Sequence, residues 1–127
     1  MEAHARETYP EECCGFLLGP PAEPRTVASL RRATNVAETN RARRYVIDPR
    51  ETLAVEKDLS GSGAEILGFY HSHPDHPAEP SEFDRSHAWP WYSYVILSIV
   101  ERKPADLRAW TLDGETSTFR SEPLSIA

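Results

Sequence analysis

Two histidines separated by one residue stand at the end of an apolar run. His71 and His73 follow residues 66–70, which read as a buried strand. If the strand continues through them, both imidazoles point to the same face, because side chains alternate along a strand. Asp84 offers an anionic group further along the chain. Two histidines and one carboxylate, with a fourth position left for water, are the typical ligand set of a catalytic zinc site.

A proline-rich loop connects the histidines to this acid. Pro74, Pro77 and Pro80 each fix a backbone angle, so the loop is stiff when it delivers Ser81 and Asp84. Both motifs also have plainer explanations. A lone His-x-His pair is more often solvated or structural than metal-binding, and Ser-x-x-Asp is a common way to begin a helix. The two readings are compatible, since a capped helix start would hold both residues in fixed positions.

A second segment that could take part in catalysis lies upstream. Residues 12–19 read Glu-Cys-Cys-Gly-Phe-Leu-Leu-Gly, an acid followed by a short apolar strand. Taken with His-x-His, seven residues, Ser, two residues and Asp, this pattern resembles the signature of the JAMM (MPN-plus) metallopeptidases. The motifs themselves cover about two dozen residues, whereas the fold that the resemblance implies covers nearly the whole chain.

The resemblance assigns a role to each motif residue. It implies that zinc is held by His71, His73 and Asp84, where it lowers the pKa of a bound water to about 7. It implies that Glu12 is the general base and that Ser81 donates a hydrogen bond to the oxyanion. The expected enzyme is therefore a zinc metallopeptidase that hydrolyses an amide bond.

Neighbouring residues compete for these roles. Without the resemblance, Glu12 is an ordinary surface acid beside Glu11; the Glu-x-Cys spacing to Cys14 favours Glu12. His76 and His87 are predicted to face solvent or to lie behind the ligands.

Three further groups are predicted to have no role at the metal. Asp75 is not expected to be a ligand, His4 is predicted to lie on the surface, and Cys14 is predicted to be a small buried residue. Cys13 and Cys14 are the only cysteines, and adjacent cysteines are poorly placed for a disulfide. This usage predicts reduced thiols and a cytoplasmic protein.

Composition narrows the function further. The 127 residues suffice for one domain, predicted to span residues 1–127, and the net charge of −6 disfavours nucleic-acid binding. No apolar run is long enough to span a membrane, and the N-terminus lacks the form of a signal peptide. Relatives usually begin with a further strand and a fuller helix, so the resemblance implies a short or late-starting N-terminus and leaves the first edge of the sheet open. The sequence carries no signal for the oligomeric state.

The hydrophobic pattern predicts a mixed α/β domain with one curved, largely antiparallel sheet and flanking helices. Asp48 is expected to cap a helix with Pro49 at its first position, turning Leu53, Val55, Leu59 and the stem of Lys57 partly inward. The hairpin signal Asp113-Gly114 separates the last two strands. The predicted helices are 1–8, 50–59 and 82–87, and the predicted strands are 14–18, 26–33, 45–47, 66–70 with its continuation, a central 94–100, 107–112 and 116–119.

The resemblance also implies a substrate class. Small members of this family resemble enzymes that cut after the terminal Gly-Gly of ubiquitin-like or sulfur-carrier proteins. Such a tail has no side chains, so its backbone can approach a metal closely. The leaving group stays open between free cysteine, a lysine side chain and a peptide. The role of Trp89 and Trp91 also stays open: they could form a surface for a partner or belong to the core.

Other function classes fit the sequence less well. A non-catalytic MPN scaffold or interaction module is the alternative, although such members have lost metal ligands that are all present here. A zinc deaminase would need His-x-Glu and Pro-Cys-x-x-Cys, neither of which occurs. A DNA-repair relative is disfavoured by the acidic charge.

Overall fold

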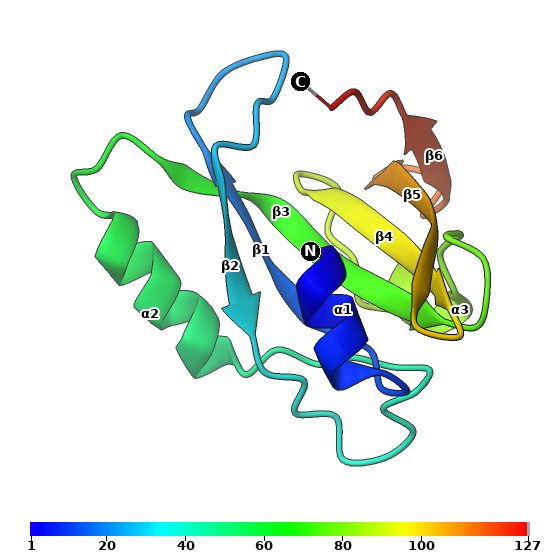
Figure 1. Cartoon of the computed structure of the whole chain (residues 1–127). Helices are drawn as coiled ribbons and strands as arrows, with labels where there is room; N and C mark the ends of the chain where they lie inside the picture. Colours follow the sequence, from blue (N-terminus) through cyan, green and yellow to red (C-terminus); the bar gives the residue numbers. More distant parts are fainter. Residues whose placement is uncertain (127) are drawn as a thin grey trace.

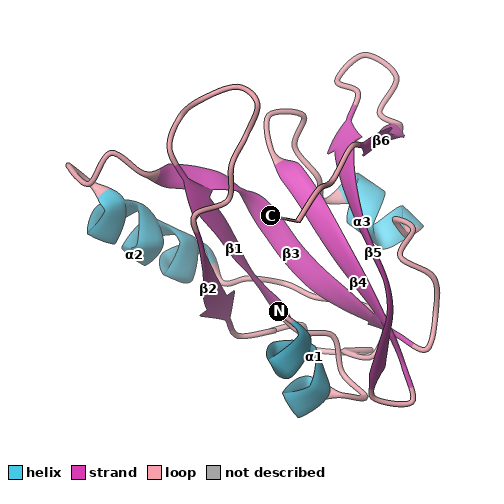
Figure 2. Cartoon of the chain, turned by 45° about the horizontal axis from the view of Figure 1, so that its top comes forward, coloured by secondary structure: helices cyan, strands magenta, loops and turns pink. Residues whose placement is uncertain are grey.

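A computed structural model describes residues 1–126, in which six strands form one mixed sheet in the order β2-β1-β3-β4-β5-β6. Figure 2 shows these strands as a continuous twisted sheet with the helices at its flanks. Four of the five pairings are antiparallel, and only β3 and β4 run parallel. The predicted single α/β domain with a largely antiparallel sheet is therefore confirmed. The elements are α1 (Glu2–Thr8), β1 (Cys14–Gly19), β2 (Ser29–Ala33), α2 (Pro49–Leu59), β3 (Glu65–Pro74), α3 (Glu82–Ser86), β4 (Ser93–Val100), β5 (Lys103–Leu112) and β6 (Phe119–Glu122).

The sheet separates two apolar layers. Helix α1 covers one face, where Ala5 packs among side chains of β1, β3, β4 and β5. Helix α2 covers the other, where Val55 packs against Cys14 and Phe16. Figure 1 shows α1 in front of the sheet and the short α3 behind it. Alternation along the strands places the two histidines of β3 on the α2 side, together with Phe69.

The parallel contact between β3 and β4 depends on a glycine. A Cβ at Gly68 would lie 1.8 Å from the carbonyl oxygen of Ser93, its partner in the ladder. No side chain fits there, so glycine lets the strand that carries the histidines sit against the central strand.

Several predicted elements hold, and some need correction. Asp48 caps α2 with Pro49 at its first position, as predicted. The predicted strand 45–47 is wrong: the Val46 N–H donates to the Asn35 side chain and not to a strand. Leu53 was predicted to turn inward but is 65% exposed, because the buried stripe of α2 is centred on Val55.

Other corrections concern element lengths and exposure. The stem of Lys57 does not turn inward, since that residue is exposed. The second strand begins at Ser29 and not at residue 26. The last strand begins at Phe119 and not at residue 116. The Asp113 side chain accepts hydrogen bonds from the Glu115 and Thr116 N–H groups, which lengthens the turn. No helix within residues 1–126 is both long and apolar enough to cross a membrane.

Candidate metal centre

Four buried side chains converge at one end of the sheet. Glu12, His71, His73 and Asp84 each offer a ligand atom, and these atoms all lie within 4.8 Å of one another. All four residues are buried, and Glu12 is only 1% exposed. Burial of two acids and two imidazoles without a countercharge is costly, so such a group calls for a bound cation.

The β1–β3 ladder explains how Glu12 reaches the histidines. Cys14 pairs with His71 in this antiparallel register. Two residues further on each strand, Glu12 comes opposite His73, on the same face. The contact continues beyond the regular ladder, because the Ser72 N–H donates to the Cys13 carbonyl at 3.1 Å. The two-residue spacing from Glu12 to Cys14 therefore equals the period of a strand, so both side chains point to the same face.

The proline loop brings the second acid back to this face. His76 and Ala78 are tied down through their carbonyls, which accept hydrogen bonds from Ser98 and Trp110 on β4 and β5. Ser81 then caps α3: its hydroxyl accepts from the Asp84 N–H, and its own N–H donates to Asp84 Oδ2 at 2.9 Å. The predicted helix cap therefore fixes the carboxylate of Asp84.

Three of the ligand atoms have the spacing of a tetrahedral site. His71 Nε2, His73 Nε2 and Asp84 Oδ2 are separated by 3.0–3.2 Å. Tetrahedral zinc with bonds of 2.0–2.1 Å holds its ligands about 3.3 Å apart. His73 Nδ1 donates to the Pro77 carbonyl at 2.7 Å, which leaves its Nε2 lone pair directed at the group. These residues therefore fit a zinc-sized cation.

The protonation states suit the same purpose. Burial alone would raise the pKa of Asp84, but its close approach to His71 and His73 and the hydrogen bond from the Ser81 N–H lower that pKa well below its usual range. Burial lowers the pKa of His71 more than Asp84 raises it. The group therefore offers an ionised carboxylate and a neutral imidazole, the forms that bind a metal.

Glu12 differs from Asp84 in having no hydrogen bonds of its own. Within residues 1–126, neither of its carboxylate oxygens has a hydrogen-bond partner. Burial, and then the negative charge of Asp84, raise the pKa of Glu12 to about 9 in the metal-free protein. The Glu12 side chain is therefore buried, unpaired and directed at the metal group, a suitable state for a proton acceptor that is charged only beside a cation.

This raised pKa predicts how the metal-free protein responds to pH. Between the unfolded value of 4.5 and the folded value of about 9, the native state keeps a proton that the unfolded chain has released. The contribution of Glu12 to the free energy of unfolding is therefore fully present below pH 4.5. It is lost as pH rises toward 9, by up to about 1.4 kcal/mol per pH unit. Gln at this position cannot titrate.

In the presence of a chelator, the melting temperatures of wild type and Glu12→Gln should therefore diverge as pH rises, the variant being more stable. A difference in melting temperature that stays constant with pH would contradict the assignment.

Comparison with known proteins identifies the family. Residues 1–113 match the family described as prokaryotic homologues of the JAB domain. This chain belongs to that family. The match confirms the JAMM (MPN-plus) resemblance that the two motifs carry.

Relatives and solved structures agree with this membership. The chain is 40% identical over 116 residues to a desampylase of Haloferax volcanii, covering 87% of this chain and 81% of the relative. It is 31% identical to a CysO-cysteine peptidase of Mycobacterium tuberculosis, covering 99% and 84%. A solved protein from Desulfitobacterium hafniense superposes with a TM-score of 0.81 at 34% identity, covering 96% and 82%. A JAB1/MPN domain protein from Archaeoglobus fulgidus, at 18% identity and a TM-score of 0.55 over 87% and 79%, shares the fold.

The other histidines of this JAB-domain protein lie outside the group. His76 is half-buried and stacks on His73, with ring centroids 4.1 Å apart. His87 is exposed and stacks on Phe83. Both agree with the predicted positions. The predicted surface position of His4 is wrong: it is 7% exposed, and its Nδ1 lies 2.8 Å from the Tyr70 hydroxyl under α1.

The remaining competitors also lie elsewhere. Glu11 is exposed, as is Asp75, which accepts a hydrogen bond from Tyr9 at 2.5 Å. Cys13 and Cys14 are buried free thiols, as predicted for Cys14.

Sequence reasoning missed one neighbour of the group. The ring of Tyr45 stacks on His71 with centroids 4.5 Å apart. Tyr45 also lines a cavity of about 190 Å³ that includes Asp84 and is walled by Phe69, Phe83 and Trp89. The apolar run 45–47 that contains Tyr45 predicts a strand, and its composition does not indicate the wall of a site.

The tryptophans near this cavity are on the surface. Trp89 and Trp91 are 56% and 57% exposed, and their rings stack 5.2 Å apart. Of the two roles left open for them, a place in the core is excluded.

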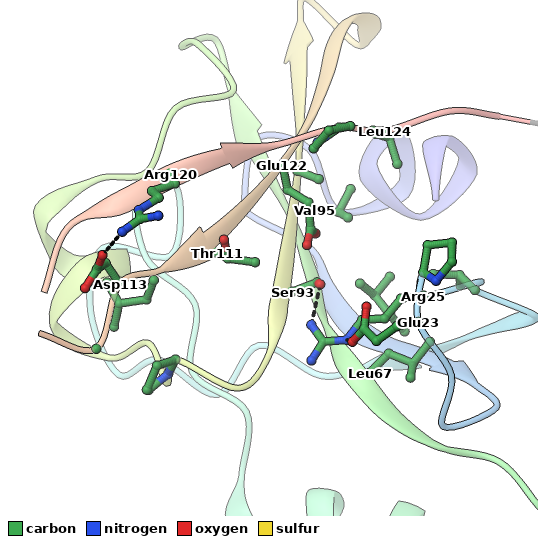
Figure 3. Close-up of a pocket in the computed structure, with 18 of the residues that line it drawn as sticks. Glu23, Arg25, Leu67, Ser93, Val95, Thr111, Asp113, Arg120, Glu122 and Leu124 are labelled. Atoms are coloured by element: carbon green, nitrogen blue, oxygen red, sulfur yellow. Dashed lines mark hydrogen bonds and ion pairs between the residues drawn. The ribbon is translucent and has the colours of Figure 1, made fainter.

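A larger cavity than the one beside Asp84 lies on the opposite face of the sheet. It measures about 940 Å³ and is lined by Leu17, Leu67 and Val95 from three strands. Figure 3 shows Arg25 directed into it, with its guanidinium bonded to the Ser93 hydroxyl at 2.7 Å. None of the four residues of the metal group lines it. Size alone therefore does not mark the chemical site in this chain.

Proposed function

We propose that residues 1–127 form one metallopeptidase domain that hydrolyses a peptide or isopeptide bond after the C-terminal Gly-Gly of a ubiquitin-like or sulfur-carrier protein, using zinc. The observation that carries the proposal is the buried group of Glu12, His71, His73 and Asp84, whose ligand atoms lie within 4.8 Å of one another. Relatives named desampylase and CysO-cysteine peptidase are consistent with this substrate class. Reduced buried thiols fit the predicted cytoplasmic location.

His71, His73 and Asp84 would hold the zinc. Zinc supplies Lewis acidity that makes water a nucleophile at neutral pH. Glu12 takes the proton of the attacking water and passes it to the leaving amine, a role that suits an unpaired carboxylate beside a cation. Ser81 donates a hydrogen bond to the oxyanion; its hydroxyl oxygen already accepts from the Asp84 N–H, and its proton is free to be donated.

The 190 Å³ cavity beside Asp84 supports a tail-binding role. Its aromatic walls would receive an apolar side chain upstream of the Gly-Gly, while the glycines bring the scissile carbonyl close to the metal.

The test is incubation of the zinc-loaded protein with a Gly-Gly conjugate, with and without a chelator, followed by mass spectrometry. Three conjugates of one carrier protein, to cysteine, to the Nε of lysine and to a peptide, separate the leaving groups. We expect release of the carrier ending in Gly-Gly, blocked by the chelator. Bound zinc without hydrolysis of any conjugate would favour the alternative, a non-catalytic scaffold.

A change at Ser81 separates its two roles. Loss of the cap alone in Ser81→Ala should cost about 1 kcal/mol of stability and leave turnover per folded molecule nearly intact. An oxyanion role adds a fall in turnover of about a hundredfold or more. Ser81→Asn caps well but presents its donor differently, so we expect it to melt near wild type yet react slowly. Thermal melts paired with single-turnover rates decide this; rates that follow only the folded fraction would reduce Ser81 to a cap.

A further inference from the structure

One asparagine uses its whole side chain to fasten a long loop to the metal group. Asn35 lies just after β2, at the start of the segment between β2 and α2. Its Nδ2 donates to the carbonyls of Glu12 at 3.1 Å and Arg44 at 2.9 Å. Its Oδ1 accepts from the N–H groups of Ala37 at 3.1 Å and Val46 at 3.2 Å. Two donors and two acceptor sites are all that the amide has, so its hydrogen-bonding capacity is filled.

These bonds close residues 36–46 into a loop that is held against Glu12. The ends of the loop meet where the Val36 N–H donates to the Val46 carbonyl at 2.9 Å. In its middle, the Arg41 carbonyl accepts from the Glu12 N–H at 2.8 Å. Both backbone polar groups of Glu12 are therefore bonded to this loop or to Asn35, and not to the sheet ladder, whose pairs begin at Cys14.

The orientation of the Glu12 carboxylate depends on this backbone. Among residues 1–126, no protein group donates a hydrogen bond to either of its oxygens. Nothing at the side-chain end fixes its direction, so the position of its Cα and the packing around it must do so. A shift of the backbone is transmitted directly to the carboxylate.

The Asn35 amide also binds the backbone on both sides of Tyr45, whose ring lies beside His71. Arg44 and Val46, both bonded to Asn35, are the residues on either side of Tyr45. The Tyr45 ring stacks on His71 at 4.5 Å with an angle of 26° between the planes. Asn35 thus fastens the chain at two points that border the metal group from different elements.

We propose that Asn35 is a positioning residue for the hydrolysis, acting through the backbone of Glu12. The inference rests on the proposed function and adds a residue that never touches substrate or metal. Loss of its two donors removes the bond to the Glu12 carbonyl, so that among the described residues the bond from the Glu12 N–H to the Arg41 carbonyl is left to hold this backbone to the loop. A displacement of the base of this kind is expected to lower turnover while substrate binding and zinc content are kept.

The test compares two isosteric changes in the segment between β2 and α2. Asn35→Asp removes the two donors and keeps the size of the side chain. Asn40→Asp makes the same change of charge at an exposed position, where the described residues provide no side-chain hydrogen bond. Asn35→Ala serves as a second variant without added charge. Each protein is assayed for folded fraction, zinc content, kcat and KM on a Gly-Gly conjugate.

We expect kcat of both Asn35 variants to fall by about tenfold to a hundredfold, with KM within about twofold of wild type and zinc retained. Asn40→Asp should match wild type. In a Glu12→Gln background, Asn35→Asp should cause no further loss of the residual single-turnover rate, because the residue through which it acts is gone.

The outcomes separate this inference from the proposed function. A wild type that cleaves no conjugate overturns both. An active wild type whose Asn35 variants keep kcat, or lose it equally in the Glu12→Gln background, overturns the inference alone. Failure of both Asn35 variants to give a folded, zinc-loaded protein would also overturn it, since the role would then be structural.

Discussion

Glu12→Gln is expected to abolish hydrolysis while leaving fold and zinc intact. The glutamine side chain has the same shape and loses no protein hydrogen bond, because in residues 1–126 the carboxylate makes none. It cannot accept a proton at neutral pH, so we expect kcat to fall by about a hundredfold to ten-thousandfold. Steady-state kinetics on a Gly-Gly conjugate, with zinc measured in the same samples, give the result.

The adjacent acid is the matched control for this change. Glu11 is exposed, whereas Glu12 is buried, although the two are neighbours in the chain. Glu11→Gln should have wild-type turnover. A Glu12→Gln enzyme with near-normal turnover would show that another group is the base.

The second large effect concerns the metal. Wild type should hold about one zinc per chain, and His71→Ala or Asp84→Ala should lose most of it, because each removes one of three protein ligands. Asp84→Asn is a sharper probe: it can still accept from the Ser81 N–H that helps begin α3, but it offers a neutral ligand. We expect it to bind zinc weakly, and to lose hydrolysis with the zinc.

An exposed histidine of the same region controls for general damage. His87 stacks on Phe83 and lies outside the group, so His87→Ala should keep its zinc. Elemental analysis after gel filtration measures zinc in the wild type and in all four variants. Full zinc in both His71→Ala and Asp84→Ala would exclude the site as drawn.

The sequence predicted this site better than it predicted the surrounding loops, and the reason is physical. His71 and His73 lie on β3, and Glu12 stands two residues before Cys14, the first residue of the paired strand β1. Side chains alternate with a fixed period along such strands, so spacing along the chain becomes position on a face. Ser81 and Asp84 sit at a helix start, whose capping geometry is also fixed. In both cases local rules determine the three-dimensional arrangement.

The segment before α2 follows no such rule. Residues 45–47 look like a strand by composition, yet their conformation depends on hydrogen bonds to Asn35 and on packing against His71. Those partners come from other parts of the chain. His4 was likewise misplaced, because its burial depends on a contact with Tyr70, 66 residues away. Such long-range contacts leave no periodic signal.

Titration of zinc into the metal-free protein tests the central claim most directly. The protein is stripped with a chelator, zinc is added in steps, and the rate of cleavage of a Gly-Gly conjugate is measured at each step. If the group of Glu12, His71, His73 and Asp84 is the catalytic centre, activity should rise linearly from zero and level off at about one zinc per chain. Full activity before any zinc is added, or an activity that does not follow the first zinc bound, would contradict it.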